Sequence, residues 1–157
     1  GREPLVLRHG IFREEELLTK PEDIVPVKGI PEALAALSAL GGKHYLVTHR
    51  NSLALKWLEM ANLLHYFTDW VVAEDGFPRK PQPNSLNHLL QKHGLDRAAC
   101  VMIGDRPLDT QAGHNAGMLA CLLDEEGRFP QEPCDVRTAS AGTLAGLLCP
   151  EGVVKQV

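Results

Sequence analysis

The chain has 157 residues and a formal net charge of −4, with 44% hydrophobic and 23% charged residues. This length and composition fit one globular domain with a sizeable core, and the negative charge provides no basic surface for nucleic acid. No run of about 18 apolar residues occurs, so no membrane span is expected, and no signal peptide is evident. Together these properties predict a cytoplasmic protein.

Cysteine and histidine spacing gives no sign of a zinc site. The seven histidines do not fall at spacings typical of metal ligands. The cysteines are scattered without a Cys-x-x-Cys pair, which indicates buried free thiols rather than zinc ligands or disulfide bonds. They are Cys100, Cys121, Cys134 and Cys149.

Strands and helices are predicted to alternate along most of the chain. In order, the predicted elements are a helix over 29–40, a strand over 44–48, a helix over 52–64, a strand over 70–73, a helix over 84–93, a strand over 100–104, a helix over 108–116, a strand over 118–122, a loop over 124–136 and a terminal helix over 138–148. A further helix is predicted over 12–18, where three successive glutamates form a solvated face. The alternation predicts an α/β fold: a doubly wound, mainly parallel sheet with helices on both faces.

The most informative segment is 101–109, where a short apolar strand breaks at a glycine and is followed by two aspartates. Asp105 comes directly after the strand, at the edge where open α/β sheets build their active sites. Asp109 follows within the first helical turn, close enough to share a cation with Asp105. Two carboxylates at such a place suit Mg²⁺. The alternative is structural, because Asp is also common in turns and in the first turn of a helix.

Two upstream residues also follow predicted strands. Thr48 ends a strand, where its hydroxyl and the next backbone N–H can face an anion; the alternative is a cap on the helix that follows. Lys80 lies on a proline-stiffened loop after the strand over 70–73, where a fixed positive charge can neutralise both a phosphate and nearby carboxylates. Its alternative is a solvated lysine in a turn.

The three features occur in the order hydroxyl, lysine, carboxylate pair, each after a separate strand. In this order the sequence resembles the haloacid dehalogenase-like (HAD) phosphohydrolase superfamily, over residues 27–123. Residues 45–48 resemble its second motif, residues 80–83 its third and residues 104–109 its fourth. Residues 48–51 together with 104–107 are most similar to the phosphoglycolate-phosphatase-like branch, whose cap is inserted early in the chain.

This resemblance implies hydrolysis of a small-molecule phosphate ester through an aspartyl-phosphate intermediate. Thr48 would bind a phosphoryl oxygen through its hydroxyl, assisted by the backbone N–H of His49. Lys80 would hold both the nucleophile and the transferring phosphoryl group. Asp105 would hold Mg²⁺, directly or through water, and Asp109 would orient the water shell of the metal. Phosphoglycolate, nucleotides, sugar phosphates and protein phosphate are all open as substrates.

One departure from the family is important. Members begin with a central strand ending in Asp-x-Asp, whose first aspartate is the nucleophile and whose second is the acid/base, and no Asp-x-Asp occurs in this sequence. We therefore expect an N-terminally truncated chain, with residues 1–25 a remnant of the cap or of the cap-to-core linker and residues 26–157 the core domain. The alternative is a non-catalytic descendant that binds phosphate or a partner.

Two other classes fit less well. A response-regulator receiver also combines carboxylates, a threonine and a lysine around Mg²⁺, but there the carboxylates come first in the chain. A dehalogenase does not need a cation, so the carboxylate pair argues against it.

Overall fold

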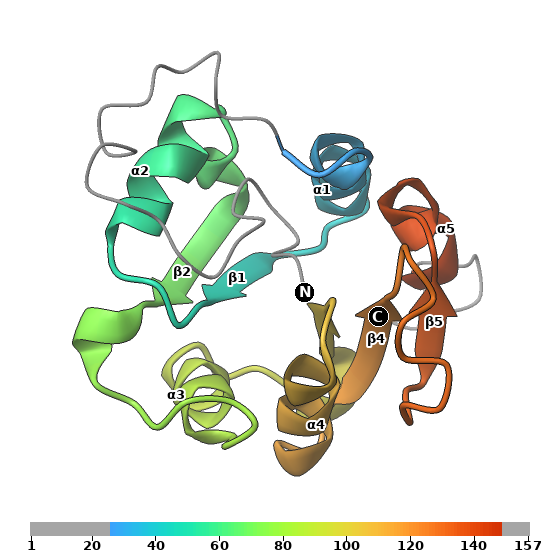
Figure 1. The fold of residues 1–157 in the computed structure, drawn as a ribbon. Helices are drawn as coiled ribbons and strands as arrows, with labels where there is room; N and C mark the ends of the chain where they lie inside the picture. Colours follow the sequence, from blue (N-terminus) through green and yellow to red (C-terminus); the bar gives the residue numbers. More distant parts are fainter. Residues whose placement is uncertain (1–25, 149–157) are drawn as a thin grey trace.

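The computed structural model describes residues 26–148, which form an α/β fold (Figure 1). The helix predicted over 12–18, the segment 1–25 and Cys149 lie outside the described residues. The helices are α1 (Ile30–Ala39), α2 (Leu53–Met60), α3 (Asn84–Lys92), α4 (Pro107–Asn115) and α5 (Leu144–Leu148). The strands are β1 (His44–Val47), β2 (Phe67–Val71), β3 (Val101–Gly104), β4 (Leu119–Leu123) and β5 (Val136–Thr138). Short 3₁₀ turns are η3 (Leu64–Tyr66), η4 (Ala73–Asp75), η5 (Arg97–Ala99) and η6 (Ala141–Thr143).

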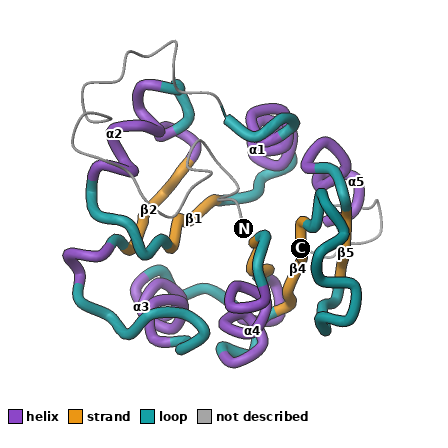
Figure 2. The backbone as a smooth tube through the Cα atoms, viewed as in Figure 1, coloured by secondary structure: helices purple, strands orange, loops and turns teal. Residues whose placement is uncertain are grey.

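All the described strand pairs are parallel, as predicted, but the strands form two hydrogen-bonded groups rather than one sheet. One group is β1–β2, and the other is β3–β4–β5. Figure 2 shows the two groups apart, and within the described part of the chain no further strand lies between them. One edge of β1 and one edge of β3 are therefore not paired with a described strand.

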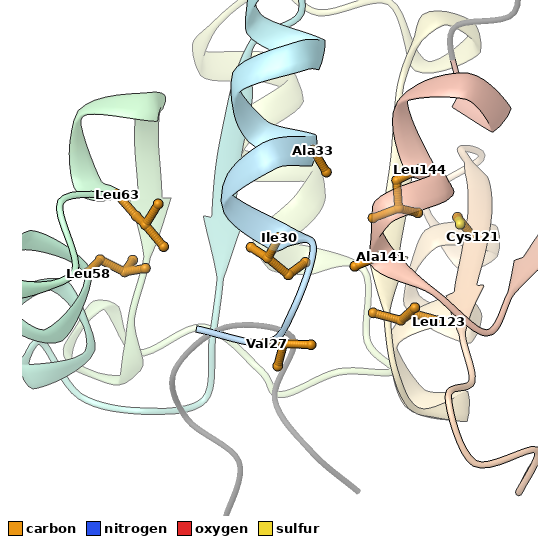
Figure 3. Packing of buried hydrophobic residues seen from close by; sticks show 9 residues of the cluster. All are labelled: Val27, Ile30, Ala33, Leu58, Leu63, Cys121, Leu123, Ala141 and Leu144. Atoms are coloured by element: carbon orange, nitrogen blue, oxygen red, sulfur yellow. The ribbon is translucent and has the colours of Figure 1, made fainter. Parts of the chain in front are cut away.

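Helices cover both faces of the strands, as predicted. On one face, α1 contacts α5 and η6 and joins a buried apolar cluster (Figure 3). The cluster comprises Val27, Ile30, Ala33, Leu58, Leu63, Cys121, Leu123, Ala141 and Leu144. On the other face, α3 packs on β1 and β2, and α4 packs on β3 and β4. Leu86, Ala112 and Ala116 are buried there, and Val47, Met102 and Met118 pack against them. The cluster in Figure 3 includes two residues of β4, and Leu46 of β1 and Phe67 of β2 pack against it, so α1 and its neighbours connect the two strand groups.

Helix α2 is shorter than predicted. The apolar spacing over 52–64 predicts one helix, but α2 ends at Met60 and residues 64–66 form a 3₁₀ turn. Asn62 adopts a left-handed conformation with φ of 59°, which asparagine tolerates better than most residues. The Leu63 N–H then donates to the Leu58 carbonyl at 2.8 Å, closing the helix end. The apolar pattern runs past the end of α2 because Leu63 is also buried in the core, although it lies after the helix and not in it.

Two further boundaries were predicted wrongly. Strand β2 starts at Phe67 rather than residue 70, because its polar members Thr68 and Asp69 do not read as part of an apolar run. The terminal helix begins only at Leu144, since residues 136–138 form β5, and Ser140 accepts the Gly142 N–H to start a 3₁₀ turn. The 124–136 segment is a loop up to β5, as predicted.

Three cysteines lie within the described residues, and all three are free thiols, as predicted, but only Cys121 is buried, whereas Cys100 and Cys134 are half-buried. Burial raises the pKa of Cys121 to about 12, so its thiol stays protonated in the core of β4. Of the helices in residues 26–148, none combines the length and the apolar character that crossing a membrane requires.

Candidate active site

The turn after β1 holds Thr48 in a fixed position. Its backbone N–H donates to the Val71 carbonyl at 3.0 Å, which continues the β1–β2 pairing by one residue. Its hydroxyl oxygen accepts the Arg50 N–H at 3.1 Å, and the Arg50 carbonyl accepts the Ala73 N–H at 2.8 Å. The Thr48 side chain therefore closes its own turn and does not cap α2. A hydroxyl that accepts one bond still has its proton to donate to an anion.

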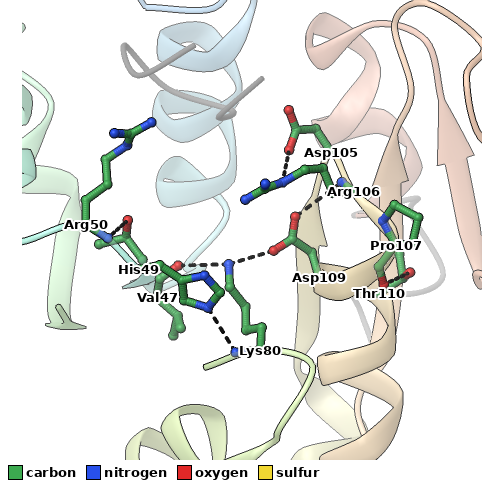
Figure 4. A network of polar contacts seen from close by, with 10 residues as sticks. Val47, His49, Arg50, Lys80, Asp105, Arg106, Pro107, Asp109 and Thr110 are labelled. Carbon is green, nitrogen blue, oxygen red and sulfur yellow. Dashed lines mark hydrogen bonds and ion pairs between the residues drawn. The ribbon is translucent and has the colours of Figure 1, made fainter. Parts of the chain in front are cut away.

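Lys80 is not a solvated lysine. Its ammonium donates to Asp109 Oδ1 at 2.6 Å and to the Val47 carbonyl at 3.4 Å (Figure 4). The side chains of Lys80 and Asp109 are only 7% and 5% exposed. The lysine therefore connects the carboxyl end of β1 to the first turn of α4 across the region between the two strand groups.

The backbone around Lys80 is fixed at two points. The Lys80 N–H donates to His49 Nε2 at 2.9 Å (Figure 4). On the other side, the Asn115 amide at the end of α4 donates to the Pro81 carbonyl at 2.9 Å. One contact therefore comes from the turn after β1 and the other from the helix after β3. Neither side chain was predicted from the sequence to have this role, although the adjacency of His49 to Thr48 was an available signal.

Asp109 also stabilises the start of α4. Its Oδ2 accepts the Arg106 N–H at 3.2 Å, and Pro107 occupies the first turn, where its missing N–H costs nothing. The structural alternative, an aspartate in the first turn of a helix, is therefore correct for Asp109. The same carboxylate also pairs with Lys80, so the structural role does not exclude a role in the site. A Cβ at Gly104 would collide with the Asp109 side chain, so glycine at the end of β3 allows this close approach.

Asp105 lies directly after β3 and is buried, with 6% of its surface exposed. Its Oδ1 lies 4.0 Å from Arg106 Nε (Figure 4). Arg106 thus supports the aspartate electrostatically from the neighbouring position. The structure places His49 and Lys80 in one hydrogen-bonded network with Asp109. Thr48 adjoins this network along the chain, beside His49, and Asp105 lies next to it through Arg106.

The chemistry of these donors fits Mg²⁺. Both buried carboxylates are hard oxygen ligands, and Mg²⁺ in proteins is typically bound by one or two carboxylates together with several waters. Both Asp109 oxygens already accept bonds, from Lys80 and from the Arg106 N–H. In such a site Asp105, directly after β3, would hold the ion, and Asp109 would accept a bond from a metal-bound water. Within residues 26–148, no three His, Cys, Asp or Glu side chains come together as a preformed metal cage.

The positive charges of this region act on His49. Burial, together with the neighbouring positive charges of Lys80, Arg79 and Arg106, lowers the pKa of His49 to about 4, although Asp109 acts in the opposite direction. The imidazole is therefore neutral at physiological pH, and one of its nitrogens can accept a hydrogen bond.

The family of the chain follows from direct comparison. Residues 10–123 match the family model described as haloacid dehalogenase-like hydrolase, and the chain belongs to this family. This confirms the predicted resemblance to the HAD superfamily, and it excludes the receiver alternative.

Relatives and solved structures agree with this assignment. The chain is 30% identical over 127 residues to the phosphoglycolate phosphatase of Cupriavidus necator, covering 78% of this chain and 55% of that protein. It is 29% identical over 92 residues to the D-glycero-alpha-D-manno-heptose-1,7-bisphosphate 7-phosphatase of Photorhabdus laumondii, covering 55% of this chain and 50% of that protein. The crystal structure of a HAD phosphatase from Thermococcus onnurineus superimposes with a TM-score of 0.81 at 23% identity, covering 90% of this chain and 66% of that chain, which shows the shared fold. The chain thus spans about half the length of these two curated relatives.

Proposed function

We propose that this chain is the core of a Mg²⁺-dependent phosphate-monoester hydrolase that acts through an aspartyl-phosphate intermediate. The observation that carries the proposal is the contact of the buried Lys80 ammonium with both the end of β1 and Asp109. In a HAD hydrolase family member, this puts a fixed positive charge at the carboxyl ends of parallel strands, beside a hydroxyl and two carboxylates. Phosphoryl transfer mainly requires such positioning and charge stabilisation.

Three groups of this chain would bind the phosphoryl group. The Thr48 hydroxyl would donate to one phosphoryl oxygen, and the backbone N–H of His49 would donate to the same oxygen or its neighbour. Lys80 would neutralise charge on the phosphoryl group as the bond to the leaving group weakens. Because Thr48 and Lys80 are already held by other contacts, little reorganisation would be needed when the substrate binds.

Asp105 would hold the Mg²⁺ ion, directly or through water, and Asp109 would orient its water shell. The ion, when bound, would supply Lewis-acid stabilisation of the phosphoryl oxygens. Asp109 would also hold the Lys80 ammonium at the end of β1, which the 2.6 Å ion pair supports.

The nucleophile would come from a strand outside the described residues. In the family, the strand that ends in Asp-x-Asp is central, and here β1 and β3 each have an edge that is not paired with a described strand. We propose that this strand lies between them. Its first aspartate would attack phosphorus as the ester P–O bond breaks, and its second would protonate the departing alkoxide. Water would then hydrolyse the aspartyl-phosphate to inorganic phosphate and the free carboxylate.

The domain organisation is proposed on the same basis: residues 1–25 lead from the cap, and residues 26–157 are the core. The two curated relatives are named for a phosphoglycolate and a sugar bisphosphate, so a small-molecule phosphate ester is the proposed substrate class. The absence of Asp-x-Asp from the 157 residues favours one second candidate, a non-catalytic protein that binds phosphate or a partner.

The test is to express the complete reading frame and to screen it against phosphoglycolate, sugar phosphates, nucleotides and p-nitrophenyl phosphate, with Mg²⁺ or with EDTA. We expect turnover that requires Mg²⁺ and that Asp105→Asn reduces at least about 100-fold. Asp96→Asn is the matched control, because Asp96 only caps an exposed 3₁₀ turn. A complete protein that binds phosphate but turns over none of these esters would favour the non-catalytic candidate.

A further inference from the structure

The imidazole of His49 has no role in the mechanism above, which uses only the backbone N–H of that residue. Yet the ring is partly buried and lies between the turn that carries Thr48 and the segment that carries Lys80. It joins two phosphate-binding elements that are more than thirty positions apart in the chain.

The ring accepts a hydrogen bond from the backbone of Lys80. The Lys80 N–H points at His49 Nε2 at 2.9 Å, so Nε2 carries no proton, and the neutral ring carries its proton on Nδ1. No water and no other side chain is needed to satisfy this backbone donor. The geometry therefore assigns the ring one defined tautomer.

The fixed backbone sets the position of the Lys80 ammonium. Beyond this point the lysine side chain runs, largely buried, to the Val47 carbonyl and Asp109. Val47 precedes Thr48 at the end of β1. The backbone of Lys80 is therefore held by His49, and its ammonium contacts the same strand end just before Thr48. A shift of the Lys80 backbone would move the ammonium relative to the Thr48 hydroxyl.

We infer that His49 is a positioning residue, whose unprotonated Nε2 fixes the Lys80 segment against the phosphate-binding turn. The inference rests on the proposed role of Lys80, but the contact itself can be tested without turnover. The charges that face the ring, from Lys80, Arg79 and Arg106 with Asp109 opposing them, favour the neutral form that the bond requires.

The experiment uses the ¹⁵N-labelled protein expressed from the complete reading frame. Long-range ¹H–¹⁵N spectra of the imidazole at pH 7 should show His49 protonated at Nδ1 and unprotonated at Nε2. In His49→Ala, the Lys80 amide should exchange with solvent about tenfold faster, the loss expected for one net hydrogen bond. His65→Ala, which removes an exposed histidine, should leave Lys80 exchange unchanged. Asn115→Ala removes the hydrogen bond to the Pro81 carbonyl on the other side of Lys80, and it should leave the His49 tautomer unchanged.

Two results would overturn the inference. One is a wild-type His49 ring protonated at Nε2, which decides the question even if His49→Ala fails to fold. The other is unchanged Lys80 exchange in a folded His49→Ala variant. Absence of phosphatase activity in the complete protein would contradict the proposed function and leave the His49 result as it stands, so the two failures are distinguishable.

Discussion

At the residue scale, Lys80 and Asp109 form the contact on which the site depends. Both side chains are almost fully buried, and each also binds the backbone of another segment. Burying two charges is costly, and the pair compensates through a short ion pair and additional hydrogen bonds. Removing one member leaves the other charge buried and unpaired, which is more damaging than removing both.

Replacing Lys80 should therefore destabilise the chain. We expect Lys80→Met to lower the free energy of unfolding by about 3 kcal/mol, because the Asp109 carboxylate loses its partner in a buried position next to Asp105. Urea unfolding followed by circular dichroism measures the change. Lys56→Met, at an exposed position on α2, should change stability by less than about 0.5 kcal/mol. A Lys80→Met/Asp109→Leu double variant no more stable than Lys80→Met would contradict this account.

The glycine at the end of β3 gives a second prediction. Gly104→Ala should destabilise by about 2 kcal/mol or more, because the new Cβ would collide with the Asp109 side chain and displace it from Lys80 and from the Arg106 N–H. Thermal unfolding provides the measurement. Gly146→Ala is the matched control, since a Cβ there meets nothing within 4 Å and should be neutral or stabilising. Equal stability of the two variants would show that the end of β3 can adjust.

At the element scale, a carboxylate on β2 holds the end of α3. Asp69 Oδ2 binds Lys92 at 2.7 Å and His93 at 2.8 Å, and the Tyr45 ring lies 5.0 Å from the His93 ring. These contacts fix α3 on β1 and β2, and therefore fix the loop before α3 that carries Lys80. The hydrogen bonds from Lys92 and His93 hold the pKa of Asp69 well below its usual range.

This lowered pKa predicts how stability depends on pH. An aspartate with a lower pKa in the folded state than in the unfolded state stabilises the fold above pH 4, and the stabilisation is lost as the pH falls through the folded-state value. Asp69→Asn should therefore cost about 1 to 2 kcal/mol at pH 7 and progressively less below pH 4. Urea unfolding between pH 7 and pH 2 measures this, with Asp96→Asn as the control. A difference in unfolding free energy between wild type and Asp69→Asn that stays constant from pH 7 to pH 2 would contradict this prediction.

At the scale of the whole molecule, the two strand groups are joined mainly by packing on α1 and its neighbours. The proposed nucleophile strand would pair with both β1 and β3 and would complete both the sheet and the site. The site and the sheet would then depend on the same missing element.

The 157-residue chain alone should therefore not turn over phosphate esters, since neither Thr48 nor Asp105 is placed to replace an attacking aspartate. It should still bind Mg²⁺ weakly, which calorimetry can measure, because two carboxylates remain and water can fill the other coordination positions. Mg²⁺-dependent turnover by this chain, purified free of contaminating phosphatases, would show that the catalytic groups are misidentified.

The edges of β1 and β3 that pair with no described strand predict association. Open strand edges are templates for pairing with another chain, so the 157-residue chain should be less stable and should associate as its concentration rises. Light scattering after size exclusion measures this, with the complete protein for comparison. A chain that stays monomeric at high concentration would indicate that the edges are covered.

The sequence alone determined the class of fold, the order of the elements and the residue types at the strand ends. It could do so because hydrophobic period, glycine and proline are local signals, and because the motifs around Thr48, Lys80 and Asp105 each follow a strand. It failed where neighbours outweigh local pattern: at Asn62, which ends α2 early, and at β5, which exists only because β4 lies beside it. The split into two strand groups was also beyond local signals.

Only the tertiary structure decided which atoms meet. Lys80 pairs with Asp109, and His49 accepts the Lys80 N–H; both are contacts between residues about thirty positions apart. Such contacts depend on how β1, α4 and the Lys80 loop pack together, which no local pattern encodes. The chemistry available to the site could therefore be predicted from its residue types, whereas the arrangement that would make it usable required the packed fold.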